Sequence, residues 1–526
     1  MQPRIPPRRA ASLLALLLAA STAGCFPAAA ELVVANGPDV QVLDPQRASA
    51  SPDGRVLAAL YAGLTRLDPR TLAPEPGLAE EFAQSGGGRV WTFRLRAGLR
   101  WSDGSALTVD DVVASWRRLL DPATASPWRE WLEDLDGDAG LRVTGERELT
   151  VRFRHPFPAF GEICAHHALA PVHARVRAAH GATAASDVQS APVSGPFTLV
   201  SRKVRDRVRV ARNPLYWDAA DVRLQSVDFL TVESQFTALN LFLAGAVHYS
   251  AGDVPALAVP ALEARARAAA PVPAGGVAEF APAPFWGTDF YRFQTGAPPF
   301  DDARVRQAFA MAVDREALAA TLGGGRRAAW SFVPPDGSGY ALPEGPRFDP
   351  AAARALLAAA GHPDGAAMPP VELLFNSAEL HRDVAEVLQA QWREHLGVAV
   401  RLQNQEWRVV LDAQRRLRYQ ISRSSWIGDY LDPATFLEIF RPDSPNNRTG
   451  WADAGYVADL DAARSAPDPG RRNAALRRAE ARLLAEAPIL PLFHYSRMDL
   501  ASPRLRGFHR NLRGWIDWGR LALAED

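Results

Sequence analysis

Apolar and polar positions alternate or recur with helical spacing along most of this chain, which predicts a mixed α/β protein. In residues 419–424 the side chains alternate with a period of two, which is typical of a strand. The strand is expected to end in a tight turn that carries Trp426 and Asp429. Asp432 followed by Pro433 has the pattern of a helix N-cap and first helical position. The pattern therefore predicts a strand, a charged and aromatic turn, and a helix.

Helical spacing with end signals predicts further elements. Thr108 with Asp111 three residues later resembles a capping box and predicts a helix behind it. Residues 301–319 predict one amphipathic helix, and Asp349 with Pro350 opens another helix that ends near residue 361. The other expected elements are a hairpin in 79–96, a strand, helix and parallel strand in 371–375, 380–396 and 398–403, a helix over 474–484 capped by Asn473, and a strand at 489–495.

Length and charge limit the classes of protein that the chain can represent. Its 526 residues exceed one ordinary core and predict two or three domains. The 48% hydrophobic and 22% charged content is typical of globular proteins. Because the formal net charge is +0, charge gives no reason to expect nucleic acid or an anionic membrane as a partner. Function must come from a specific site.

Residues 1–30 have the pattern of a secretory signal peptide, with three arginines before a short apolar run. Two processing sites fit, and the sequence leaves both open. Small residues at 28–30 suit ordinary cleavage, whereas residues 22–25 resemble a lipoprotein box, with Thr22 in place of the usual leucine, in which Cys25 would be acylated. We expect an exported protein in either case. Cys164, the other cysteine, is expected to be a small buried residue.

The sequence contains no catalytic or metal-binding motif of a standard kind. It has no Gly-x-Ser-x-Gly elbow, Walker loop or His-Glu-x-x-His helix. His166, His167 and His173 lie near Cys164, but their spacing matches no standard zinc module. We therefore expect no catalytic residue, metal or cofactor. An exported hydrolase is the alternative from another class, and it would need a nucleophile and a base that are not recognisable.

Several motifs occur in a fixed order along the chain. They are the segments at 39–45, 90–128, 194–197, 212–217 and 300–315. Together they resemble the periplasmic oligopeptide-binding proteins, which belong to extracellular solute-binding protein family 5 and are the substrate-binding subunits of ABC peptide importers. The resemblance extends from about residue 32 to the carboxyl end. The order of the motifs is more specific than any one of them.

The resemblance implies an α/β protein with the two-lobed periplasmic-binding-protein fold (type II, cluster C) and an additional α/β segment on the first lobe. Crossings near Pro284 and Tyr495 would allow the lobes to close over a ligand. The implied division is a signal peptide at 1–30, lobe I at 31–56, 187–284 and 496–526, an extra domain at 57–186, and lobe II at 285–495.

The resemblance also implies two anchors for a bound peptide. Asp429 matches the aspartate that accepts the amino terminus, although a turn aspartate often bonds only its own backbone. Arg423 matches an arginine that meets the carboxylate of shorter peptides. The alternative interpretation is that Arg423 is a solvated arginine at the end of a strand. His381 matches a histidine that meets the carboxylate of longer peptides. The alternative interpretation is that His381 is an ordinary histidine on a helix surface.

Aromatic and small polar residues complete the implied site. Trp426, Trp407 and Trp128 fall where the family places the aromatic walls of side-chain pockets, whereas most tryptophans pack in cores. Ser425 and Ser51 are further polar candidates. The chain departs from the family's peptide binders in having Ser49 in place of a glutamate, Gln414 in place of a second arginine, and Gly287 and Ile427 near the places of a cysteine pair.

The expected function is that of a periplasmic receptor. It would capture short peptides between its lobes and deliver them to the permease subunits of an ABC importer in the inner membrane, as a monomer that binds no nucleic acid. Ser49 and Gln414 leave open a different solute of the same fold, namely a nickel complex, glutathione, a cell-wall peptide or an oligosaccharide.

Overall fold

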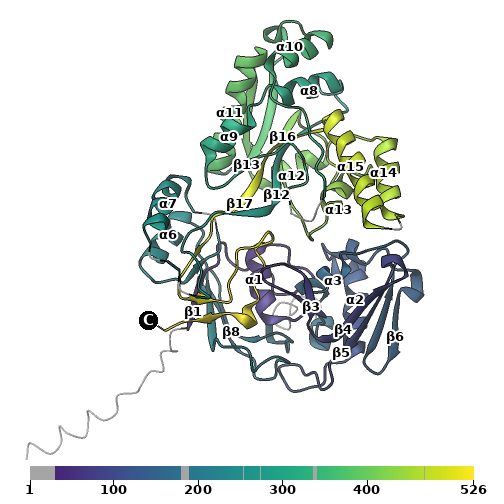
Figure 1. Ribbon diagram of the computed structural model, residues 1–526, viewed down its shortest axis with the longest axis vertical. Coiled ribbons are helices and arrows are strands. Elements are labelled where there is room, and N and C mark those ends of the chain that lie inside the picture. Colours follow the sequence, from purple (N-terminus) through teal and green to yellow (C-terminus); the bar gives the residue numbers. More distant parts are fainter. Residues whose placement is uncertain are drawn as a thin grey trace, which may run out of the picture.

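Three sheets of four or more strands organise the described part of the chain (Figure 1). The computed structural model describes residues 30–178, 189–252, 254–269, 271–272, 274–335, 340–466 and 468–525. The predicted signal peptide with Cys25 lies outside these residues, apart from Ala30, and so does the predicted boundary at 186 and 187. Of the helices in these ranges, none is both long enough and apolar enough to cross a membrane.

The first lobe is built on a six-stranded sheet in the order β18-β11-β1-β10-β9-β8. The central strand β1 is parallel to β10 and β11, whereas the outer pairings are antiparallel. Helix α1 buries Val56, Leu57 and Leu60 in the core that this sheet forms. The elements are β1 (Leu32–Ala35), α1 (Ser51–Leu60), β8 (Phe197–Lys203), β9 (Arg207–Arg212), β10 (Ser226–Leu230), α6 (Gln235–Leu243), β11 (Tyr249–Ser250), α7 (Val259–Ala268) and β18 (Leu500–Ala501).

The carboxyl-terminal segment returns to this first lobe. Phe508 and Trp518 are buried in the same core as β1, and Trp518 packs edge-on against Phe229. A short pair of strands, β19 (Leu505–Arg506) and β20 (Ala522–Leu523), closes the segment. Residues near the end of the chain therefore lie beside residues near its beginning, as the yellow and purple ribbons show (Figure 1).

A four-stranded antiparallel sheet, β4-β5-β7-β6, forms a further segment beside the first lobe. Its core includes Trp91, Phe93 and Leu95 from one face of β5, as their alternation predicts. The Thr108–Asp111 capping box is present and opens α2. The elements are β2 (Thr65–Leu67), β3 (Pro74–Pro76), β4 (Ala79–Ser85), β5 (Val90–Leu95), α2 (Val109–Leu120), β6 (Leu141–Gly145), β7 (Glu148–Arg152), α3 (Phe160–Ile163) and α4 (Ala174–Arg177).

The second lobe has a sheet in the order β13-β17-β12-β16-β14-β15 with helices on both faces. Tyr291 and Phe293 of β12 pack in one core with α8 to α11, whereas Phe290 packs in another with α13 to α15. The strands are β12 (Ala283–Phe293), β13 (Arg327–Ala328), β14 (Val371–Asn376), β15 (Val400–Gln405), β16 (Ile421–Ile427) and β17 (Ile489–Arg497). The helices are α8 (Ala303–Met311), α9 (Arg315–Leu322), α10 (Pro350–Ala359), α11 (Glu379–Leu396), α12 (Trp407–Arg415), α13 (Ala434–Leu437), α14 (Ala454–Arg464) and α15 (Pro469–Glu486).

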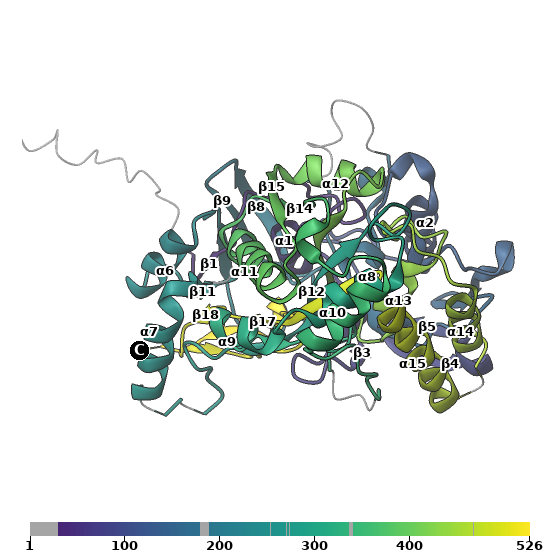
Figure 2. The same ribbon diagram turned by 90° about the horizontal axis from the view of Figure 1, so that it is seen from above.

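Seen from above, α14 and α15 lie together at one side of the molecule, away from α11 (Figure 2). The predicted strand, helix and parallel strand of this lobe are confirmed as β14, α11 and β15, with α11 ending at the left-handed Gly397. Proline is tolerated at position 491 because it lies at a bulge, where the register of β17 on β12 shifts.

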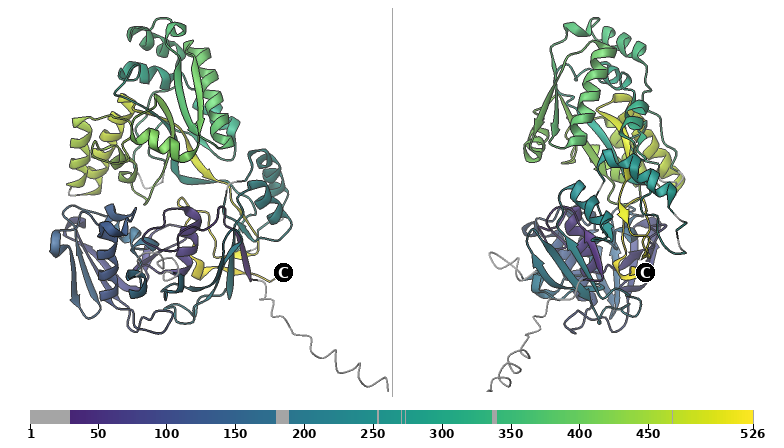
Figure 3. Two further views of the ribbon diagram at one scale, coloured as in Figure 1. Left: turned by 180° about the vertical axis from the view of Figure 1, so that it is seen from behind. Right: turned by 90° about the vertical axis from the view of Figure 1, so that its left-hand side faces the viewer.

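Two antiparallel strands connect the lobes. β12 enters the second lobe and β17 leaves it, and Ala283 pairs with Arg497 and Pro284 with Ser496 where the chain passes between the lobes. The views from behind and from the side show these strands as a narrow connection (Figure 3). A connection of two paired strands leaves the facing surfaces of the lobes available to form a cleft.

Three predicted element boundaries are wrong, each because of a side chain near a helix end. The expected single helix over 301–319 is divided into α8 and α9, because the Asp314 side chain accepts a hydrogen bond from Ala317 N and starts a new helix. Helix α15 begins at Pro469 and is capped by Asp468 rather than Asn473. The predicted N-cap Asp432 lies one residue too early, because Pro433 is the N-cap of α13. The Asp432 carboxylate precedes the cap and accepts a hydrogen bond from Ala434 N.

Candidate functional site

The turn after β16 is held tightly against the second lobe. Gly428 N donates to Trp286 O at 2.9 Å, and a side chain at 428 would collide with the Trp286 ring. Asp429 N donates to Thr435 Oγ1 at 3.1 Å. Asp432 pairs with Arg472 through two hydrogen bonds. Because Asp432 is already occupied by an arginine, Asp429 is the carboxylate of this turn that is available for another partner.

Asp429 lies in a cavity rich in carboxylates, which we call the acidic cavity. It has a volume of about 500 Å³ and lies between the segment at 130–159 and the second lobe. Burial raises the pKa of Asp429 to about 6, while the Arg513 guanidinium opposes the rise. Burial, and secondly the charge of Asp429, raise the pKa of Glu130 to about 7. The acidic lining residues are Glu130, Glu133, Asp134, Asp429, Glu438 and Asp443, and the cavity is also lined by Arg154, Arg464 and Arg472, of which Arg154 pairs with Asp134 and Arg464 with Glu438.

Trp426 also lines the acidic cavity, through an indole that has an unused donor. Its Nε1 is buried and has no hydrogen-bond partner among the described residues. A buried N–H without a partner is costly. Trp426 and Asp429 thus place an aromatic wall and a carboxylate on one cavity.

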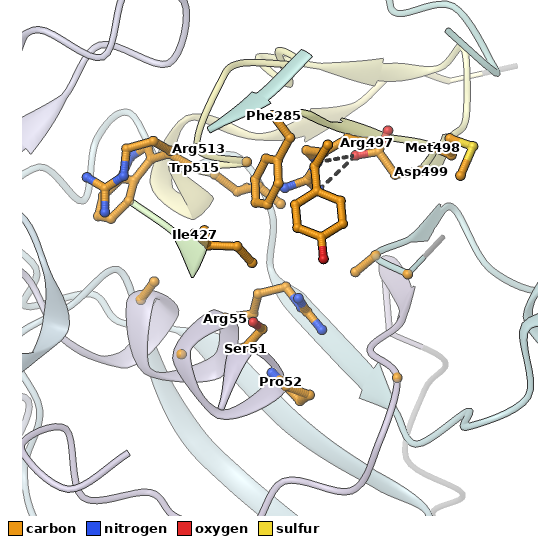
Figure 4. Close-up of a pocket in the computed structure, with 18 of the residues that line it drawn as sticks. Ser51, Pro52, Arg55, Phe285, Ile427, Arg497, Met498, Asp499, Arg513 and Trp515 are labelled. Carbon is orange, nitrogen blue, oxygen red and sulfur yellow. Dashed lines mark hydrogen bonds and ion pairs between the residues drawn. The ribbon is translucent and has the colours of Figure 1, made fainter. Parts of the chain in front are cut away.

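A second cavity opens between the two lobes, and we call it the interlobe cavity (Figure 4). Its volume is about 600 Å³. Helix α1 contributes Ser51 and Arg55 from the first lobe, whereas His381 and Arg423 belong to the second. Ile427 borders this cavity while Trp426 borders the acidic cavity, so the end of β16 contacts both. The apolar lining of the interlobe cavity includes Phe285, Leu380, Ile427, Met498, Trp515, Ile516 and Trp518.

Arg423 is part of a buried ion pair within the second lobe. Its Nε lies 3.1 Å from Asp289 Oδ2 on the neighbouring strand, and its Nη2 donates to Tyr495 OH at 2.7 Å. The Tyr495 hydroxyl donates to the same carboxylate oxygen at 2.9 Å. The Arg423 and Asp289 side chains are only 8% and 3% exposed. Arg423 therefore borders the interlobe cavity with its charge already compensated.

His381 lies at the start of α11 with its Nδ1 3.2 Å from Asn376 O. Burial, and secondly the charge of Arg423, lower the pKa of His381, which favours the neutral ring at pH 7. In the neutral ring Nδ1–H donates to the Asn376 carbonyl, and Nε2 is then an acceptor. His381 must gain a proton before it can donate to a carboxylate from Nε2.

The structure does not bring the other predicted residues into these two cavities, apart from Ser51. Trp128 donates from Nε1 to Ala48 O at 2.8 Å and packs on His166, so it lies behind a wall of the interlobe cavity. Trp407 is 45% exposed at the start of α12 and lines neither cavity. Ser425 lines neither and hydrogen-bonds Tyr495. Trp128, Trp407 and Ser425 thus have packing or surface positions in this structure.

Several lining residues were missed by the sequence reasoning. Phe285, Arg497, Asp499, Arg513 and Trp515 come from the connecting strands and the carboxyl-terminal segment, where no motif marked them. Arg55 of α1 had a usable signal, because it lies outside the apolar stripe formed by positions 56, 57 and 60 of that helix. Gln414 is buried and donates to Ser422 Oγ and Arg423 O.

The histidines near Cys164 have structural partners. His167 Nδ1 lies 2.9 Å from Pro45 O, and burial lowers the pKa of His167 to about 4. His166 Nδ1 accepts a hydrogen bond from Ala168 N. Cys164 is buried, as predicted. Within the described ranges, no group of three or more His, Cys, Asp or Glu side chains is placed to hold a metal ion.

Comparisons with known proteins agree with the family that the order of the motifs predicts. The family model described as bacterial extracellular solute-binding proteins, family 5 Middle, matches residues 73–448. A probable deoxycholate-binding periplasmic protein of Escherichia coli (strain K12) is 32% identical, with 90% of this chain and 89% of that protein covered. A periplasmic oligopeptide-binding protein of Salmonella typhimurium is 30% identical, with 95% of both chains covered.

Solved structures give the same result. The oligopeptide-binding protein of Haemophilus influenzae in complex with the peptide RPPGFSPFR has a TM-score of 0.80 at 26% identity, with 94% of this chain and 99% of that chain covered. The murein tripeptide-binding protein of Escherichia coli has a TM-score of 0.81 at 29% identity, with coverages of 94% and 98%. These similarities confirm the predicted family and the two-lobed α/β fold. The chain belongs to the bacterial extracellular solute-binding proteins of family 5.

Proposed function

We propose that this protein is the peptide-binding receptor of an ABC importer. The observation that carries the proposal is the acidic cavity, which Asp429 and Trp426 line together. A carboxylate of this kind is suited to the ammonium group of a peptide, and an aromatic wall is suited to a peptide side chain. Relatives named for oligopeptides and murein peptides support the same class of ligand.

The bound peptide would lie along the end of β16. Its amino terminus would bind Asp429 in the acidic cavity, and its chain would pass into the interlobe cavity beside Ile427. Arg423 and His381 are the second-lobe residues proposed to meet the carboxylate end. Because Asp289 compensates Arg423, and because His381 must gain a proton, each would contribute less than an uncompensated arginine.

The proposed setting follows from the family. The protein would act in the periplasm after export, either released by cleavage near residue 30 or anchored through an acylated Cys25. It would act as a binding protein rather than an enzyme, as a monomer, and would deliver peptide to permease subunits in the inner membrane. Size-exclusion chromatography with light scattering, with and without peptide, tests the monomeric state.

Isothermal titration with matched tetrapeptides tests the function. We expect the unmodified peptide to bind, and we expect amino-terminal acetylation to weaken binding by at least about tenfold, because the Asp429 carboxylate loses a charged donor. Native mass spectrometry of the purified protein should show a bound species of peptide mass. Equal affinity for the acetylated and unmodified peptides would contradict the ammonium site.

Peptide affinity is expected to fall as the pH is lowered from 7.5 to 5. The pKa of Asp429 is raised to about 6, so the ligand-free carboxylate becomes protonated below that pH, and only the ionised form attracts an ammonium group. Glu130 and Arg513 act on the same carboxylate and modify the midpoint of the transition. Titration at pH 6 in buffers of different ionisation enthalpy should reveal proton release on binding. A flat profile between pH 5 and 7.5 would be inconsistent with this site.

The apolar lining of the interlobe cavity favours a second candidate ligand, an apolar molecule that carries one carboxylate. One relative is named as a probable deoxycholate-binding protein. Such a ligand would have no ammonium group and would bind without the acidic cavity. Titration with deoxycholate distinguishes the candidates, because its affinity should not depend on Asp429.

A further inference from the structure

The arginines that line the interlobe cavity differ in how their charges are compensated. Arg423 pairs with Asp289, Arg497 with Asp499, and Arg513 with Glu162. Arg510 also pairs with Asp499, so each of the two carboxylate oxygens of Asp499 contacts an arginine. Arg55 has no ion-pair partner among the residues that the structure describes. Of the described arginines that line the cavity, Arg55 is therefore the one whose charge has no acidic partner.

Arg55 is held in place by neutral groups. Its Nε donates to Asn36 Oδ1 at 2.8 Å, and its Nη2 donates to Asn36 O. Asn36 is buried and donates from Nδ2 to Pro52 O, which fixes it against the first turn of α1. Because Nε and one Nη2 hydrogen are used at Asn36, the Nη1 side of the planar guanidinium remains for another acceptor.

The nearest acid along the helix, Asp53, acts on Arg55 only through space and forms no ion pair with it among the described residues. Asp53 directs both carboxylate oxygens to the backbone N–H groups of Gln41 and Val42, at 2.8 and 3.1 Å. Burial lowers the pKa of Arg55 to about 10, which reflects the cost of a charge without a partner. The close-up shows Arg55 projecting from α1 into the space below Phe285 (Figure 4). An entering anion would compensate this charge.

We propose that Arg55 is a ligand-binding residue that recognises a carboxylate in the interlobe cavity from the first lobe. The proposal rests on the proposed function and adds to it a preference for ligands that carry an anionic group on an apolar body. The carboxylate belongs to a peptide terminus or an acidic side chain, with an apolar carboxylate such as deoxycholate as the other source. A guanidinium fork suits a carboxylate because it can offer two parallel donors.

This placement has a consequence for the two lobes. Arg55 belongs to α1 of the first lobe, whereas Arg423 and His381 belong to the second lobe, and all three border one cavity. A ligand bound in this cavity can be contacted from both sides of the cleft. Contacts made to both lobes at once are stronger in the closed arrangement, so such a ligand favours closure.

Titration of the wild type and two Arg55 variants, with one control variant, tests the proposal. Wild type, Arg55→Gln and Arg55→Lys are each titrated with a tetrapeptide, with its carboxyl-terminal amide, and with deoxycholate. We expect the wild type to prefer the free carboxylate over the amide by about tenfold to a hundredfold. Arg55→Gln should lose most of this preference, with only the smaller contribution of Arg423 and His381 left, and Arg55→Lys should keep a larger part of it. Arg47→Gln, an exposed arginine outside the cavity, is the matched control and should behave as wild type.

The outcomes separate this proposal from the proposed function. Peptide binding by the wild type with an unchanged carboxylate preference in Arg55→Gln overturns the role of Arg55 and leaves the peptide receptor standing. Binding of deoxycholate but no peptide, with loss of binding in Arg55→Gln, supports Arg55 and overturns the peptide ligand. Binding of neither probe by wild type overturns both. Circular dichroism melting of each variant excludes misfolding as the cause of a loss.

Discussion

Asp429→Asn is expected to weaken the binding of peptides that have a free amino terminus by roughly 30-fold to several thousandfold. Truncating one member of a buried charge pair costs about 2–5 kcal/mol, and each 1.4 kcal/mol is a factor of about ten. Asparagine keeps the shape of the side chain, its Oδ1 can still accept the side-chain hydrogen bond from Thr435, and the Asp429 N–H bond to Thr435 does not depend on the carboxylate. Isothermal titration above pH 7, where the wild-type carboxylate is ionised, measures the loss.

Two controls make this result specific. An acetylated peptide should bind wild type and Asp429→Asn alike, because it has no ammonium group. Asp432→Asn changes a neighbouring carboxylate that is bonded to Arg472, and it should lower stability without a comparable loss of affinity. The fall in affinity between pH 7.5 and 5 should disappear in Asp429→Asn. Comparable loss in both aspartate variants would mean that the turn, rather than one carboxylate, determines binding.

The second large effect is expected at Asp289. Asp289→Asn leaves the Arg423 guanidinium buried with a neutral partner, and breaking a buried ion pair from one side costs about 3–5 kcal/mol of stability. Urea unfolding followed by tryptophan fluorescence should show the loss as a lower midpoint. The surface pair of Arg416 and Asp412 on α12 is the control, since Asp412→Ala should cost no more than about 0.5 kcal/mol.

A double variant separates the value of the pair from the cost of an unpaired charge. Asp289→Asn combined with Arg423→Met removes the buried cation as well, so the double variant should be more stable than Asp289→Asn alone. If the two single changes were simply additive, the side chains would not interact as the structure places them. A coupled pair would show that Arg423 has a structural role in the second lobe.

The local sequence was sufficient to predict an element whose formation depends on residues only a few positions apart. The alternation in β16, the capping box of α2 and the glycine end of α11 each involve neighbours a few positions apart. The local sequence was insufficient to predict the bounds of an element where two local signals competed. The apolar spacing of 301–319 favoured one helix, but Asp314 could cap a second one, and periodicity does not report which signal prevails.

The sequence by itself determined the family and the two-lobed α/β fold, because ordered motifs are encoded locally, and its resemblance to the family predicted Asp429 as an anchor. Only the tertiary structure decided that Arg472 occupies Asp432, that Asp289 compensates Arg423, and that Arg55 borders the cleft without an acidic partner among the described residues. Charge compensation depends on distances between strands and lobes that are remote in the chain. Residue spacing alone contains no such distances.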